Sequence, residues 1–144
     1  MYQSETQIRV RYAETDQMGI VYYGNYATYF EVGRVEAIRG LGYSYKDMEL
    51  DGVAMPVVAL HTKYLRAATY DEVLTVVTKI RDLPVSHEII FDCEILNEQK
   101  KLLTTGKVHL YFMDKATWKK IPMPAVLHDK LAPFYLTDKE DTSN

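Results

Sequence analysis

The chain has 144 residues, of which 47% are hydrophobic, and this is enough for one globular domain with a substantial core. Its net charge of −3 excludes the strongly basic surface that nucleic-acid binding requires. The lone cysteine, Cys93, excludes an intramolecular disulfide, and the longest apolar run, 53–60, is too short to cross a bilayer. The N-terminus also lacks the layout of a signal peptide, so we expect a cytoplasmic protein without stable membrane insertion.

A strand, a loop and a long helix are predicted in the first third of the chain. Alternating residues predict a strand over 6–12, whereas 14–24 has no clear period and is expected to be a loop. Apolar residues recur at helical spacing over 25–41, and glycines end this helix. Its inner stripe is expected to comprise Tyr26, Phe30, Gly33, Ala37 and Leu41, and its outer side Glu31, Arg34, Glu36 and Arg39.

The rest of the chain is predicted to be mainly β-structure with short connections. After a polar turn through Asp51 and Gly52, we expect strands over 57–65, 73–81, 87–96 and 102–113, a hairpin loop at 97–101, a short last strand near Ile121 and a helix over 124–134. Short connections favour antiparallel pairing, which predicts an α+β domain over 1–136 with a polar tail over 137–144. Apolar residues on both faces, as in Ile89-Ile90-Phe91, suggest a second face buried by oligomerisation.

The sharpest candidate for chemistry is Asp16, in a loop just ahead of the predicted helix. Backbone N–H groups at a helix N-terminus point outward, and a carboxylate beside such donors is a minimal apparatus for acyl transfer. The alternative is a turn acid bonded to its own backbone, which taken alone is the commoner role of aspartate. Surrounding methionine, glycine, valine and tyrosine residues favour a partly desolvated, reactive acid.

The residues at the helix start are candidates for contacting a substrate. The N–H groups of Tyr23 and Gly24 are placed to polarise a carbonyl, while the Tyr23 ring is a candidate pocket wall. Asn25 suits an N-cap as well as it suits a substrate contact. Tyr26 is balanced between pocket and core, whereas Tyr29 and Phe30 are expected in the core, so the list of substrate-binding candidates here is Gly24, Asn25 and Tyr26.

Other chemistries find little support in the sequence. The four histidines are scattered and Cys93 has no partner, so we expect no metal site and no cofactor. Ser86 and His87 are adjacent in sequence, which does not make a catalytic triad. No glycine-rich phosphate loop is present, and the lysines at 100, 101, 119 and 120 are most simply solvated charges.

The segment RYAETDQMGIVYYGNYATYFEVGR resembles the signature of hot-dog fold acyl-CoA thioesterases. The similarity is to the 4-hydroxybenzoyl-CoA thioesterase type and to the thioesterase of the bacterial Tol–Pal cluster. It extends through AMPVVALHTKYLRAATYDEVLTV and covers roughly 7–131. The resemblance implies an antiparallel sheet wrapped around one long helix, and a homodimer, paired again into a homotetramer, with active sites at the dimer interface.

The resemblance also implies roles for individual residues. Asp16 matches the catalytic acid, as nucleophile or as general base, and Tyr23 matches the position whose backbone N–H polarises the thioester carbonyl. Tyrosine at that position favours an aromatic or bulky acyl group. Pro56 and Val57 match a strand start near the acyl pocket, and Ser86 and His87 fall in a loop that meets the CoA phosphates in relatives, although 83–87 lacks Lys and Arg. Ala68 stands where many relatives have proline.

The sequence therefore predicts an acyl-CoA thioester hydrolase. Two alternatives share the fold: a non-catalytic module that binds acyl thioesters, and a thioesterase acting on acyl-carrier protein. Asp16 argues against the first. A hot-dog dehydratase is a weaker reading, because it requires a histidine at the helix entry and 14–30 contains none.

Overall fold

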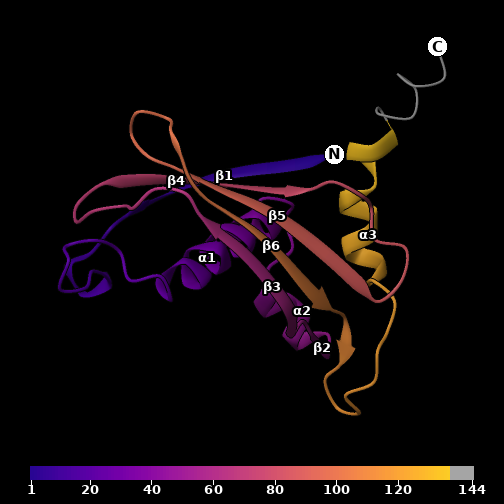
Figure 1. The fold of residues 1–144 in the computed structure, drawn as a ribbon. Coiled ribbons are helices and arrows are strands. Elements are labelled where there is room, and N and C mark those ends of the chain that lie inside the picture. Colours follow the sequence, from indigo (N-terminus) through magenta and orange to yellow (C-terminus); the bar gives the residue numbers. More distant parts are fainter. Residues whose placement is uncertain (137–144) are drawn as a thin grey trace.

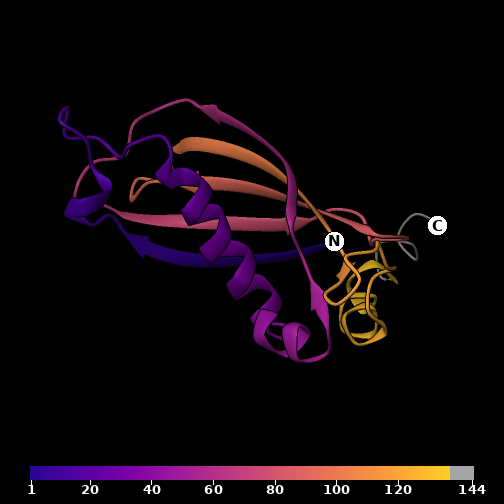
Figure 2. The same ribbon diagram turned by 90° about the horizontal axis from the view of Figure 1, so that it is seen from below.

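The computed structural model describes residues 1–136, and the predicted polar tail at 137–144 lies outside them. One long helix, α1 (Asn25–Arg39), crosses beneath a five-stranded antiparallel sheet (Figures 1 and 2). The strands are β1 (Tyr2–Arg9), β3 (Val57–Tyr64), β4 (Val73–Ile80), β5 (Glu88–Leu96) and β6 (Leu102–Tyr111), in the spatial order β1-β4-β5-β6-β3. This is the predicted α+β arrangement of a helix wrapped by a sheet.

Smaller elements complete the fold. A 3₁₀ turn, η1 (Tyr12–Glu14), follows β1, and the short strands β2 (Val53–Ala54) and β7 (Met113–Asp114) pair with each other. Helix α3 (Ala125–Leu131) lies at the far end of the sheet from the start of α1 (Figure 1). Ile121 forms no strand, and only a single bridge between Met113 and Lys120 is found there.

Helix α2 (Tyr45–Leu50), which was not predicted, comes directly before the turn at Asp51 and Gly52. Ser44 caps it, because its side chain accepts a hydrogen bond from the Asp47 N–H at 3.1 Å while the Asp47 carboxylate accepts from the Ser44 N–H at 3.0 Å. This reciprocal pair satisfies two backbone donors that a helix start otherwise leaves open. A Ser followed by an acid three residues later was the signal for this helix in the sequence.

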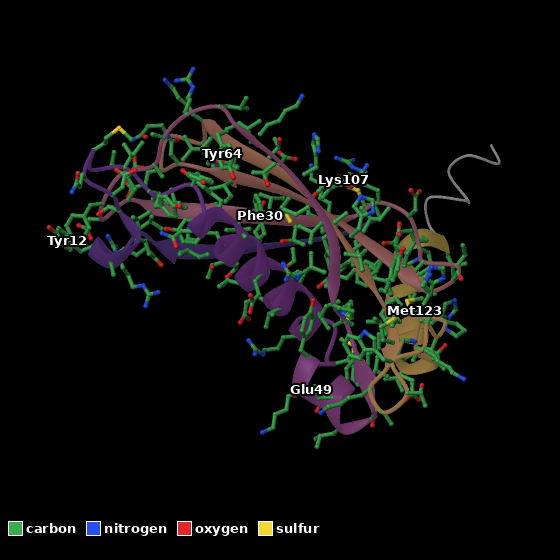
Figure 3. The ribbon with its side chains drawn as sticks, turned by 60° about the horizontal axis from the view of Figure 1, so that its bottom comes forward. Tyr12, Phe30, Glu49, Tyr64, Lys107 and Met123 are labelled. Atoms are coloured by element: carbon green, nitrogen blue, oxygen red, sulfur yellow. The ribbon has the colours of Figure 1, made fainter. Side chains whose placement is uncertain are left out.

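The inner face of α1 packs on the sheet largely as its spacing predicts. Tyr26, Phe30, Gly33 and Ala37 are buried, and Tyr29 and Ile38 join them. Gly106 of β6 leaves room for the Phe30 ring, since a Cβ at Gly106 would lie 2.5 Å from it (Figure 3). The outer side differs from prediction at one position, because Arg34 is buried with 7% of its surface exposed.

The outer face of the sheet is more polar than the sequence suggested. On β5 the inward residues Ile89, Phe91, Cys93 and Ile95 are buried. Of the outward residues between them, Ile90 is apolar, whereas Asp92 and Glu94 are charged. Exposed apolar side chains gather instead on the edge strand β3, so that edge is the better candidate for burial by another chain.

Candidate active site

The acid loop is a tight turn that closes on itself. An isolated antiparallel β-bridge pairs Thr15 with Val21, and the N–H of Asp16 donates to the Ile20 carbonyl at 2.9 Å. Gly19, with a φ of 77°, donates to the Asp16 carbonyl at 3.0 Å, and the positive φ explains the glycine. The loop is therefore held at both ends of the segment that carries the candidate acid.

The Asp16 side chain is half-buried in this loop. Its Oδ1 accepts a hydrogen bond from the Met18 N–H at 2.8 Å, which is the turn-type bond expected of an aspartate here. Its Oδ2 has no hydrogen-bond donor among residues 1–136. One oxygen thus fixes the side chain while the other is left for a substrate or a water molecule.

The start of α1 lies beside this loop and presents free donors. Gly24 occupies the N-cap position, and no side chain caps the helix. The Asn25 N–H donates to Tyr22 and the Tyr26 N–H to Tyr23, but the N–H groups of Tyr23 and Gly24 find no acceptor in the described part of the chain. Unused N–H groups at a helix N-terminus form a ready site for a developing oxyanion.

Asn25 is not the N-cap, so that part of the sequence interpretation is wrong. It is the first residue of α1, and its Nδ2 donates backward to the Glu14 carbonyl at 2.8 Å. The Tyr22 N–H donates to the same carbonyl at 2.9 Å. The side chain of Asn25 therefore joins the helix start to the acid loop.

Glu14 is one of the residues of the site that the sequence analysis missed. Its carboxylate is buried and accepts hydrogen bonds from the Arg11 N–H at 2.8 Å, from the Arg11 guanidinium, and from the Tyr29 hydroxyl at 3.1 Å. Burial alone raises the pKa of Glu14, but these hydrogen bonds and the Arg11 charge outweigh it and lower the pKa below its usual value. Burial and the same carboxylate raise the pKa of Tyr29, so its hydroxyl stays protonated and donates.

A tyrosine-lined cavity of about 200 Å³ adjoins the helix start. Tyr23 is 62% exposed, Tyr26 is buried, and Tyr64 of β3 is 51% exposed. The Tyr64 ring lies edge-on to Tyr23, with 6.1 Å between ring centroids, and 5.4 Å from Tyr26. The remaining lining residues are Ile20, Val21, Leu65, Arg66 and Ala67. Tyr64, shown in Figure 3, is distant in sequence from the helix, and only pairing of β3 with β6 places it here.

Pro56 and Val57 do not line this cavity within one chain. Val57 lines a separate groove between α1 and β3, and Pro56 lines a cavity of about 530 Å³ beside α2. Ser86 and His87 lie at the opposite end of the sheet, because β4 runs the whole distance between Val73, near the acid loop, and Ile80. Eight strand residues span about 25 Å, so these two residues cannot meet Asp16 in the same chain.

Two cations lie near Ser86 although the segment 83–87 contains no Lys or Arg. Arg81 and Lys107 line a cavity of about 290 Å³ there together with Ser86. Lys107 belongs to β6, and Figure 3 shows it on the sheet far from Tyr12 of the acid end. The sequence offered no signal that Lys107 would lie near Ser86, because this depends on the β5–β6 pairing of Asp92 with Lys107.

Residues 1–136 bring together no group of three or more His, Cys, Asp or Glu side chains suited to a metal ion. Within the same residues, no helix has the length and apolar character needed to cross a membrane.

The model of the thioesterase-like superfamily matches residues 10–131. The chain belongs to this superfamily. Among curated proteins, it is 40% identical over 121 residues to YneP of Bacillus subtilis, named as a candidate acyl-CoA thioesterase; the match covers 84% of this chain and 87% of that protein. The acyl-CoA thioester hydrolase YbgC of Escherichia coli is 27% identical over 117 residues, covering 81% and 87%.

Solved structures of the superfamily share the fold. The DHNA-CoA thioesterase of Staphylococcus aureus superposes with a TM-score of 0.90 and 37% identity, covering 98% of this chain and 96% of that one. The hot-dog fold implied by the sequence resemblance is thereby confirmed, as is membership of the thioesterase family.

Proposed function

We propose that this protein hydrolyses acyl-CoA thioesters, with Asp16 as the catalytic carboxylate and the Tyr23 and Gly24 N–H groups as donors to the thioester carbonyl. Acyl-CoA thioester hydrolysis is the activity that its superfamily relatives are named for. The observation that carries the site assignment is the juxtaposition of a fixed, half-buried acid with two N–H groups that have no acceptor in residues 1–136.

The reaction follows from what these groups offer. The carbonyl oxygen of the thioester accepts from the two N–H groups, which favour the negative charge that develops as the carbonyl carbon is attacked. In one route the free oxygen of Asp16 adds to that carbon, the C–S bond breaks, CoA leaves as a thiol after taking a proton from water, and a second water cleaves the anhydride. In the other route Asp16 takes a proton from a water molecule as that water adds to the carbon. The tetrahedral adduct then collapses, the C–S bond breaks, and the leaving CoA thiolate takes the proton from Asp16.

The acyl group that best fits the described cavity is aromatic. Tyr23 in the turn before α1, Tyr26 of α1 and Tyr64 of β3 line a space of about 200 Å³ next to the free N–H groups. Flat rings set edge-on to each other favour another ring in offset or edge contact. The DHNA-CoA thioesterase relative is named for an aromatic acyl group, which supports the same substrate class for this chain.

We further propose that the enzyme is a homodimer, paired again into a homotetramer, and that it works in the cytoplasm. Strand β3 lies at the edge of the sheet, and all but one of its eight residues are exposed. An open edge of that length is a template for pairing with another chain. Pairing with a second copy also offers a route by which Val57, Ser86 and His87 approach the site. The lone, buried Cys93 is compatible with a reducing compartment.

Thiol release from a panel of aromatic, short and long acyl-CoA esters tests the proposal. We expect fastest release from aromatic esters, and a fall in kcat of about 10²–10⁴-fold in Asp16→Asn, the range that a positioned acid or base contributes. Asp129→Asn, an exposed acid on α3, is the matched control and should leave kcat unchanged.

Undiminished turnover in Asp16→Asn would remove the acid from the mechanism. Binding of every ester without release would favour the non-catalytic module, and release from acyl-carrier protein alone would favour that donor. Single-turnover hydrolysis in ¹⁸O-water can identify the anhydride route, because ¹⁸O enters the Asp16 side chain only when water attacks the Asp16 carboxyl carbon of an anhydride.

A further inference from the structure

Arg34, in the middle of α1, is buried without an acid. Only 7% of the surface of Arg34 is exposed, and its Nε has no hydrogen-bond partner within residues 1–136. No carboxylate within residues 1–136 lies within 4 Å of its guanidinium. Arginine is almost never buried unless it is paired, because removing a guanidinium charge from water is costly. Within the described residues, the charge of Arg34 therefore has no carboxylate partner.

The surroundings of Arg34 supply little to satisfy it. A neighbouring polar group is the Tyr45 hydroxyl. Burial raises the Tyr45 pKa to about 12, whereas the charge of Arg34 and hydrogen bonding to its side chain act in the opposite direction. Cys93 is a buried thiol whose pKa burial raises to about 12. Neither neighbour is an anion at neutral pH, so the charge of Arg34 is not balanced by them.

Arg34 lines a groove of about 280 Å³ that runs between α1 and the open edge of the sheet. On the sheet side the groove is formed by Val57 and Leu60 of β3, which are 48% and 45% exposed, and by Val108 of β6. On the helix side it is formed by Ala27, Thr28, Phe30 and Glu31. A buried cation thus faces a groove with apolar walls beside an unpaired strand edge.

Glu31, one turn before Arg34 on α1, is an acid without a cationic partner in the described residues. It is exposed, it lines the same groove, and it forms no ion pair within the described residues. The groove therefore carries one unpaired acid and one unpaired base. In a twofold-symmetric dimer the same patch meets itself, so a residue i that contacts j in the partner is matched by j contacting i.

We infer that a second copy of this chain covers the groove and that Glu31 of the partner subunit pairs with Arg34, reciprocally across the twofold axis. Pairing of the two β3 edges sets the groove of one chain against that of the other, and the apolar residues Val57 and Leu60 are buried with it. The inference makes the proposed dimer specific at residue level, and it does not depend on which thioester the enzyme hydrolyses.

The first test compares two charge-neutral substitutions on the same helix. Glu31→Gln removes both reciprocal pairs, so we expect the dimer dissociation constant, measured by sedimentation over a concentration series, to rise about 10–100-fold. Glu36→Gln is the control, because Glu36 pairs with Arg39 on a different side of α1, and it should leave the constant unchanged. A monomeric wild type, or a Glu31→Gln dimer as tight as the wild type, would overturn the inference.

The second test uses reversed charges. Glu31→Arg and Arg34→Glu chains each place like charges together in a homodimer, whereas a mixed dimer restores two opposite-charge pairs. We expect each variant to be mainly monomeric and an equimolar, co-expressed mixture to form heterodimers, detected by native mass spectrometry. Failure of the mixture to dimerise while both chains remain folded would contradict the pairing.

A small carboxylate ligand is the competing occupant of the groove. Benzoate titrated into Glu31→Gln, followed by the thermal unfolding midpoint, distinguishes it: stabilisation that requires Arg34, with no change in the dimer constant between wild type and Glu31→Gln, would assign the groove to a ligand. Because dimerisation is measured without any acyl-CoA, its outcome is separate from that of the Asp16→Asn assay.

Discussion

The carbonyl oxygen of Glu14 accepts a hydrogen bond from Asn25 Nδ2 at 2.8 Å, and this bond joins the last residue of η1 to the first residue of α1. The same residue's carboxylate is held by Arg11 and by Tyr29, one turn into the helix. Asp16 lies two residues after Glu14, and the free N–H groups of Tyr23 and Gly24 come directly before Asn25. The separation between acid and donors is therefore set through Glu14.

Replacing Glu14 should reduce turnover while leaving most substrate binding intact. Glu14→Ala removes every carboxylate contact and we expect kcat to fall about 100-fold, since a misplacement near 1 Å costs about that much. Glu14→Gln keeps an acceptor oxygen for Tyr29, so its kcat should fall only about 3–10-fold. KM should change less than kcat in both variants, measured by steady-state thiol release below the unfolding temperature.

Glu5→Gln, an exposed acid on β1, is the matched control and should behave as the wild type. If the Glu14 variants lose thermal stability but keep full kcat per folded molecule, the residue supports the fold alone and does not position the site.

The lowered pKa of Glu14 predicts how its contribution depends on pH. A carboxyl whose folded pKa lies below its unfolded value of about 4.3 stabilises the fold fully above that pH and loses the contribution as pH falls towards the folded pKa. The wild type should therefore unfold at a higher temperature than Glu14→Gln at pH 6, and the gap should narrow as the pH falls below the unfolded value of about 4.3. Scanning calorimetry across this range is the measurement; a gap independent of pH would show that the charge is not the stabilising feature.

Helix α1 was predictable within a few residues because its apolar spacing is strong, but the surroundings of the site were not. Glu14 looked like any loop acid, and nothing local shows that its carboxylate meets Tyr29. Tyr64 reaches the site only through the long-range pairing of β3 with β6. Burial of Arg34 also has no local signal, because a helical pattern with arginine beside the apolar stripe normally indicates a solvated face.

The prediction for Ser86 shows a different limit of sequence reasoning. The sequence analysis assigned Ser86 to the CoA site because it matches the position of a CoA-contacting loop in relatives. Within one chain, however, the length of β4 separates Ser86 from Asp16. A site assembled from two subunits spreads its residues over distances that a single sequence does not encode.

Gly33 should resist replacement although it sits in a helix. Alanine improves helix propensity by about 1 kcal/mol, but a Cβ at Gly33 would lie 2.6 Å from Val76 Cγ1 and 2.7 Å from Thr78 Oγ1 on β4. Overpacking of this kind costs about 1–3 kcal/mol, so the net effect of Gly33→Ala on the free energy of unfolding should be destabilising. Chemical denaturation measures it, and adding Val76→Ala should restore part of the loss. A more stable Gly33→Ala protein would mean that the helix shifts away from the sheet at little cost.

Tyr64 should determine which acyl groups bind. Its ring contacts Tyr23 and Tyr26 and forms one wall of the cavity, so Tyr64→Ala should raise KM about 5–20-fold for a benzoyl-type CoA ester and much less for acetyl-CoA, which leaves the wall unused. Tyr64→Phe should have little effect, because the hydroxyl reaches the Tyr23 carbonyl only at 3.5 Å. Tyr70→Ala, which removes an exposed ring packed on Tyr12 outside the cavity, is the control. An equal rise in KM for both esters in Tyr64→Ala would show that the ring supports the helix start and does not select the acyl group.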